Sequence, residues 1–77
     1  MLEEMLFMGL RIKRGIELVK FKRIFGAGFE ESFDKKLLQK MVSEGLLIID
    51  GGSVRPTNAG ILLHTGIVRK LCENKMI

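Results

Sequence analysis

The stretch LLIIDGGSVRP, residues 46–56, is the part of the sequence that most narrowly limits the fold. Four consecutive apolar residues run into Asp50-Gly51-Gly52-Ser53, and a second short segment follows at residues 54–56. A glycine-rich turn between two short segments of this kind is typical of a β-hairpin, because glycine adopts the positive φ angles that tight turns need. The stretch therefore predicts a two-stranded hairpin, or wing.

Two helices are expected in the first 25 residues of the chain. Residues 3–10 place apolar side chains at helical spacing, with two acidic residues at the start, where the helix dipole favours them. Residues 16–25 follow Gly15 and carry Leu18, Phe21 and Phe25 on one stripe, which predicts a second helix.

A third helix is expected between the second helix and the hairpin. Ser32 is its predicted cap, and Gly45 stands where a left-handed residue ends a helix. Its predicted apolar positions are Phe33, Leu37, Leu38, Met41 and Val42.

A fourth helix is expected after the hairpin, over residues 58–73, with Thr57 as its N-cap. One predicted apolar face consists of Ile61, Thr65, Val68 and Cys72, widened by Leu62 and Leu71.

These elements predict a winged-helix-like domain that is mainly α, with a three-helix core, a two-stranded wing and a C-terminal helix. Residues 1–77 are expected to form a single domain. The apolar stretches are far shorter than the roughly 20 residues of a membrane span. A single Cys and the absence of a signal-peptide pattern indicate a cytoplasmic chain.

The composition argues against catalysis by this chain alone. It holds one His, one Cys, no Tyr and no Trp, so few groups can converge on a reaction. His64 has no His or Cys companions at ligand spacing, and we expect a surface or hydrogen-bonded structural residue. Cys72 is expected to be a small apolar packing residue, and a lone Cys excludes a disulfide or a Cys-based metal cage within the chain.

Basic charge is concentrated near the start of the chain, whose net charge is +4. Residues 1–25 hold six basic and three acidic groups. The basic run predicts either a patch that meets carboxylates or phosphates or an ordinary solvated face. Met5 and Met8 share one face of the first predicted helix with Met1, as core, interface or ligand-facing residues. The basic run comprises Arg11, Lys13, Arg14, Lys20, Lys22 and Arg23.

A winged helix also suggests nucleic acid, which would contact the third helix and the wing. The outward side chains of that helix would be Lys35, Lys36, Gln39, Lys40 and Ser43. Residues 26–50 nevertheless carry five acidic against three basic groups, and the turn of the hairpin begins with Asp50. This charge placement argues against phosphate binding as the main function.

The order of specific residues resembles the C-terminal domain of oxygen-independent coproporphyrinogen III oxidase-like radical-SAM proteins. The resemblance covers nearly the whole chain. It is carried by Glu4-Met5-Leu6-Phe7-Met8-Gly9-Leu10-Arg11, Gly15-Ile16-Glu17-Leu18, Phe21, Phe25-Gly26, Glu44-Gly45-Leu46-Leu47 and Pro56-Thr57-Asn58-Ala59-Gly60.

This resemblance implies that residues 1–77 are the C-terminal part of a larger radical-SAM protein, whose N-terminal barrel holds a four-iron four-sulfur cluster and S-adenosylmethionine. The C-terminal domain would be a non-catalytic accessory domain that packs on the barrel and helps to cover the substrate side. The sequence Met8-Gly9-Leu10-Arg11 resembles the haem-chaperone branch more than the decarboxylating oxidases, so porphyrin or haem is the implied ligand. The sequence departs from the family pattern in two places: Lys13-Arg14 is more basic, and Pro56 replaces a Leu.

Arg11 is the first candidate for a ligand contact, because its planar guanidinium binds a propionate carboxylate bidentately. The neighbouring candidates for substrate or partner contact are Lys13, Arg14, Met5 and Met8. The alternative for Arg11 is a structural role at the end of the first helix, with an ion pair to Glu17 or Glu44. Two other functions remain open, an independent nucleic-acid binder and a structural module that self-associates through its methionine-rich first helix.

Overall fold

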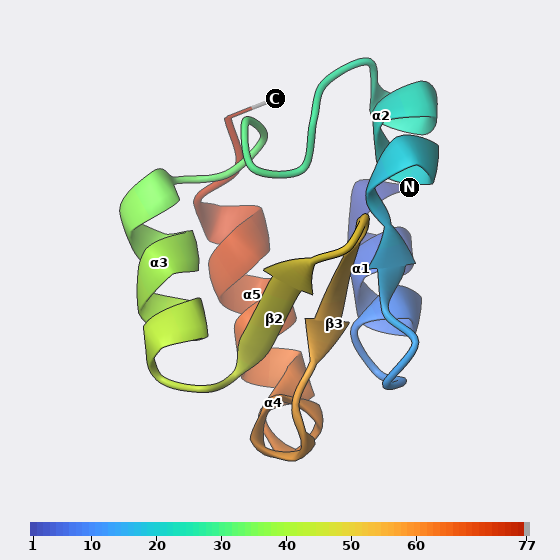
Figure 1. Cartoon of the computed structure of the whole chain (residues 1–77). Coiled ribbons are helices and arrows are strands. Elements are labelled where there is room, and N and C mark those ends of the chain that lie inside the picture. Colours follow the sequence, from blue (N-terminus) through green and yellow to red (C-terminus); the bar gives the residue numbers. More distant parts are fainter. Residues whose placement is uncertain (77) are drawn as a thin grey trace.

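The computed structural model describes residues 1–76 and confirms a mainly helical domain with a small antiparallel sheet (Figure 1). The strands lie in the order β1-β3-β2, and the element order through β3 is that of a winged helix. The elements are α1 (Leu2–Gly9), β1 (Ile16–Glu17), α2 (Leu18–Phe25), α3 (Lys35–Ser43), β2 (Leu47–Asp50), β3 (Ser53–Pro56), α4 (Asn58–Leu62) and α5 (His64–Glu73).

The hairpin forms where the glycine pair predicts it. Asp50 pairs with Ser53 at the end of the β2–β3 ladder, so only Gly51 and Gly52 make the turn. Their φ angles are 52° and 87°, and positive φ at both central residues is the requirement of a type I′ turn. Pro56 ends β3 beyond the residues that pair with β1, so its missing N–H removes no hydrogen bond on that side.

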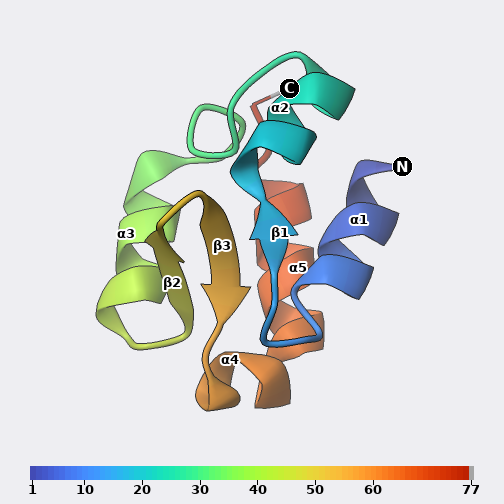
Figure 2. The same ribbon diagram turned by 45° about the vertical axis from the view of Figure 1, so that its right-hand side comes forward.

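The predicted start of the second helix is wrong, because Ile16 and Glu17 form strand β1. Ile16 pairs with Val54 on the free side of β3, as Figure 2 shows for the two strands, and both side chains are buried. Gly15 has a φ of 73° and approaches β3 so closely that a Cβ there would lie 2.1 Å from the Val54 carbonyl oxygen. Two residues are too few to show a strand period, so only the pairing with β3 reveals the strand.

The third helix begins later than predicted, at Lys35 with Asp34 as its N-cap. Ser32 is fully buried and does not cap it, because its hydroxyl donates a hydrogen bond to the Gly28 carbonyl at 2.7 Å. Phe33 lies outside the helix and forms a bridge with Lys75. The segment before α3 therefore pairs with the C-terminal segment instead of extending the helix.

The end of α3 is confirmed at Gly45, which has a φ of 75°. The Gly45 N–H donates to the Val42 carbonyl and the Leu46 N–H to the Met41 carbonyl, at 3.0 and 2.9 Å. These two bonds form a Schellman motif, which satisfies carbonyls that the helix end leaves free. Val42 was predicted as an apolar position of the helix, but it is 42% exposed, because it lines an open groove between α3 and β2.

The last predicted helix is two helices with a break at Leu63. Thr57 is the N-cap of α4 as predicted, since its hydroxyl accepts from the Gly60 N–H at 3.1 Å. Most of the predicted apolar face is confirmed, since Val68 and Leu71 are buried and Ile61 and Cys72 are half-buried. Thr65 and Leu62 are exposed, Leu62 at 86%, because the chain bends between α4 and α5. The buried residues of α5 are His64, Ile67, Val68 and Leu71.

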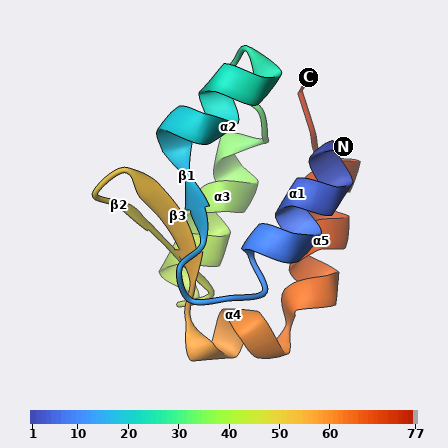
Figure 3. The same cartoon turned by 90° about the vertical axis from the view of Figure 1, so that its right-hand side faces the viewer.

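The sheet lies on one side of the helices, and α1 and α5 pack side by side behind it (Figure 3). They run antiparallel, since Phe7 near the end of α1 meets His64 at the start of α5. Phe21, Phe25, Phe29 and Phe33 make a ring cluster with centroid separations of 4.6 to 6.3 Å. The buried apolar core is Leu6, Leu10, Ile16, Phe21, Phe29, Phe33, Leu38, Met41, Leu47, Val54, Ile67, Val68 and Leu71.

None of the helices within residues 1–76 has the length and apolarity that crossing a membrane requires.

Candidate functional site

A groove of about 690 Å³ runs between α1 and the β1–α2 segment, and we call it the α1 groove. Its methionines are Met1, Met5 and Met8, of which Met8 is 65% exposed. Flexible, polarisable methionine side chains suit a surface that adapts to a partner. The remaining lining residues are Glu4, Gly9, Ile12, Arg14, Gly15, Ile16, Glu17 and Lys20.

Close backbone packing creates this groove. A Cβ on Gly9 would lie 2.3 Å from Ile16 Cγ1, so only glycine lets the end of α1 lie directly on β1. Leu10 is buried immediately afterwards, at 1% exposure, and Gly15 is held against β3. The chain between these two anchors has no room inside the fold. Residues 11–14 therefore form an outward loop in which all four side chains are exposed.

The predicted contact residues divide between this groove and its edge. Met5, Met8 and Arg14 line the α1 groove. Arg11 and Lys13 lie in the adjoining loop, exposed but outside the lining. The structure thus brings three of the five candidates to one cavity.

Two residues of the groove were missed from the sequence. Lys20 belongs to the basic run but was not among the predicted contact residues, and no sequence pattern above pointed to Ile12. Ile12 is 51% exposed in a loop of otherwise cationic residues. An isolated apolar residue in a basic loop is the signal that would have identified it.

The expected ion pair of Arg11 with Glu17 or Glu44 is absent among residues 1–76. Other groups donate hydrogen bonds to the carbonyls at the end of α1. The Leu10 N–H donates to the Leu6 carbonyl at 2.9 Å, and His64 Nε2 donates to the Phe7 carbonyl at 2.6 Å. Within the described chain, Arg11 is therefore left without a structural partner.

His64 has the satisfied structural role expected from the sequence. It is 9% exposed and lies edge-on to the Phe7 ring, with centroids 4.4 Å apart. Cys72 is half-buried, and burial is the main cause that raises the pKa of its thiol, helped by Glu3 and opposed by Lys75. A raised pKa leaves less thiolate at neutral pH, which does not suit a nucleophile.

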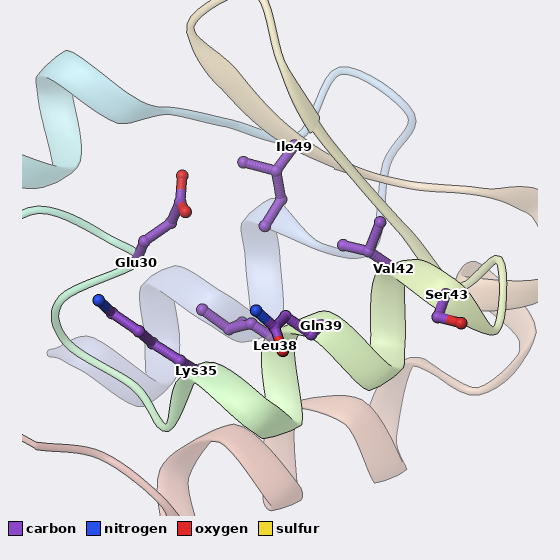
Figure 4. Close-up of a pocket in the computed structure, with 7 residues that line it drawn as sticks. All are labelled: Glu30, Lys35, Leu38, Gln39, Val42, Ser43 and Ile49. Atoms are coloured by element: carbon purple, nitrogen blue, oxygen red, sulfur yellow. The ribbon is translucent and has the colours of Figure 1, made fainter.

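A second surface lies where a winged helix would meet nucleic acid, between α3 and β2 (Figure 4). Ile49 of β2 lies across from Leu38 and Val42 of α3, so the floor of this groove is apolar. Lys35 at one end has Glu30 beside it, and at the turn Arg55 donates to Asp50 at 2.8 Å. The charges here are mixed, which gives no continuous track for phosphates.

Within residues 1–76, no three His, Cys, Asp or Glu side chains gather closely enough to hold a metal ion. An iron–sulfur cluster is held by several Cys thiolates, and this chain has one Cys. These residues do not fit such a cluster.

A family model described as the HemN C-terminal domain matches residues 1–63. The chain belongs to the HemN C-terminal domain family. No curated protein and no solved structure shows significant similarity to it. The matched residues end at the break between α4 and α5, so they include both the α1 groove and the wing.

The residues that resemble the family divide into two groups in this HemN C-terminal domain. One group is required by the fold: Leu6, Gly9, Leu10, Gly15, Ile16, Phe21, Gly26, Gly45, Leu47, Thr57 and Gly60 are buried, closely packed or caps. The other group is exposed and includes Glu4, Met8, Arg11 and Glu17. Most of the exposed group in α1 and β1 lies in or beside the α1 groove, which marks this surface as the candidate functional site.

Proposed function

We propose that this chain is a non-catalytic accessory domain of a HemN-like radical-SAM protein, and that its α1 groove packs against the barrel. The observation that carries the proposal is the exposure of Met8 and Ile12 beside Arg14 in a member of the HemN C-terminal domain family. Exposed apolar side chains gathered in one groove favour contact with a partner surface. The four-iron cluster and S-adenosylmethionine would belong to the barrel.

Binding to a separately expressed HemN-like barrel tests this proposal by isothermal titration calorimetry. Met8→Glu is expected to weaken binding at least tenfold, since it puts a charge into an apolar contact. Val19→Glu is the matched control, because Val19 is also an exposed apolar residue, at 66% exposure, but lies outside the α1 groove. Equal weakening by the two variants, or no binding by the unmodified chain, would overturn the proposal.

We further propose that the basic loop contacts the carboxylates of a porphyrin held by the complex. The exposed loop of residues 11–14 carries Arg11, Lys13 and Arg14. None of the three has an ion-pair partner among residues 1–76. A guanidinium donates two parallel N–H hydrogen bonds to the two oxygens of a carboxylate, which suits a propionate group. The domain would then cover the substrate side of the barrel.

Titration of coproporphyrin III into the chain–barrel complex, followed by absorbance, tests the loop. Arg11→Ala is expected to lower porphyrin affinity by roughly tenfold, the cost of one charge-assisted hydrogen bond, and to leave the Tm of the chain unchanged. Arg23→Ala removes the same charge from exposed α2 and serves as the control. A lower Tm would show a structural role for Arg11. Unchanged affinity would remove the propionate contact.

A further inference from the structure

A second groove, of about 440 Å³, lies between α3 and α5, and we call it the α3–α5 groove. It shares no lining residue with the α1 groove. Its apolar residues are Leu37, Met41, Leu46, Leu62, Leu63 and Ile67. Gly66 adds open space on the α5 side, since a Cβ there would meet nothing within 4 Å.

Two leucines at the edge of this groove point away from the core. Leu62 is 86% exposed and Leu63 is 56% exposed, at the bend between α4 and α5. The bend follows from two anchors. Thr57 and Gly60 hold α4 on the end of α3, whereas His64 holds α5 on α1. The helix direction must change between the anchors, and the two leucines are turned outward there.

We propose that the α3–α5 groove is the interface of a symmetric dimer, in which Leu62 and Leu63 of each copy enter the groove of the other. A two-fold interface needs a surface that is complementary to itself. The α3–α5 groove carries the protruding leucines next to its cavity. A single two-fold axis through this surface therefore places the leucines of each copy in the cavity of the other.

The charges at the rim fit the same arrangement. Glu44 lies at the end of α3, one turn after Lys40, and Lys70 lines the groove from α5; all three are exposed. None of the three has an ion-pair partner among residues 1–76. In a two-fold dimer, Glu44 of each copy faces Lys70 of the other, so the pair forms twice. A groove selective for an acidic ligand would carry only the basic side chains.

Sedimentation velocity on the chain alone tests the dimer. We expect concentration-dependent dimerisation that is evident by about 100 µM, since a small interface of this kind binds weakly. Leu62→Glu is expected to leave a monomer. Val19→Glu is the matched control, because Val19 is 66% exposed on α2 and lies outside the groove.

Charge reversal tests the geometry. Glu44→Lys and Lys70→Glu are each expected to dimerise at least tenfold more weakly, because each places like charges opposite one another. An equimolar mixture of the two variants should recover a heterodimer, since both pairs then have opposite signs. Lys36→Glu, on α3 but outside the groove, controls for the change of net charge in Lys70→Glu.

A chain that stays monomeric at every concentration would overturn the proposal. So would a dimer that Met8→Glu dissociates and Leu62→Glu does not, because self-association would then occur through α1. If both charge variants weaken the dimer but their mixture does not recover it, the two-fold pairing is wrong.

Discussion

Two helical glycines, Gly60 and Gly66, have opposite surroundings. A Cβ on Gly60 would lie 2.1 Å from the Leu46 carbonyl oxygen, which is backbone and cannot move aside. A Cβ on Gly66 would meet nothing within 4 Å. Gly60→Ala is therefore expected to lower the free energy of unfolding by about 1–3 kcal/mol, the usual cost of overpacking. Gly66→Ala should raise it by up to about 1 kcal/mol through helix propensity.

Urea denaturation at low micromolar concentration measures both effects without interference from self-association. A Gly60→Ala variant as stable as the parent chain would contradict the close approach of α4 to Leu46.

Cys72 provides a prediction at alkaline pH. Burial, with Glu3 as a second cause, raises the pKa of its thiol in the folded chain. The folded state therefore favours the neutral thiol. The resulting stabilisation of the folded state is complete below the ordinary thiol pKa and is lost as pH rises through the raised pKa of the folded chain. Reaction with a disulfide reagent should accordingly be slower in the folded chain than in urea across this range.

The comparison of folded and urea-unfolded chain at several pH values, by thiolate absorbance and reaction rate, measures this effect. Equal thiolate titration in the two states would show that burial does not act on Cys72.

At the scale of elements, His64 connects α1 to α5. Its Nε2–H donates to the Phe7 carbonyl, one of the carbonyls that the end of α1 leaves free. His64→Phe keeps an aromatic ring against Phe7 but removes the donor. We expect a loss of about 1 kcal/mol of unfolding free energy, the low end of the cost of an unsatisfied acceptor, because the bond is only partly buried.

His64→Gln retains an N–H donor and is expected to recover part of this loss in thermal denaturation. If the His64→Phe and His64→Gln variants are equally stable, His64 stabilises the fold through packing and not through this hydrogen bond.

Element boundaries were predictable where the signal is local. The turn at Gly51-Gly52, the end of α3 at Gly45 and the cap at Thr57 depend on φ angles and hydrogen bonds within a few residues. Strand β1 and the break at Leu63 were not predicted, because each depends on contact with a segment far away in the chain.

At the scale of the whole molecule, the charge distribution predicts weak binding to DNA. The expected nucleic-acid surface of α3 and the wing mixes Lys35 with Glu30 and pairs Asp50 with Arg55. Fluorescence anisotropy with a DNA duplex should give no tight binding, and a shallow dependence on salt, because few phosphates are neutralised. Sub-micromolar, strongly salt-dependent binding would instead support the nucleic-acid function.

The candidate site was only partly predictable. Met5, Met8 and Arg14 could be proposed from the methionine spacing and the basic run, and the structure places them on one groove. Ile12 and Lys20 join them only because Gly9 and Gly15 bring α1 against β1. The α3–α5 groove had no sequence signal, since Leu62 matches a buried helical position.

The sequence by itself determined the helical composition, the hairpin turn and the helix caps at Gly45 and Thr57, because short-range backbone preferences depend on neighbouring residues. It also determined that the chain has one Cys and one His with which to do chemistry. Only the tertiary structure decided that Ile16 enters the sheet, that His64 caps α1 and that Leu62 faces solvent. These outcomes depend on contacts between residues 38 to 57 positions apart, or on the anchors that bend the last helices, and no local pattern contains them.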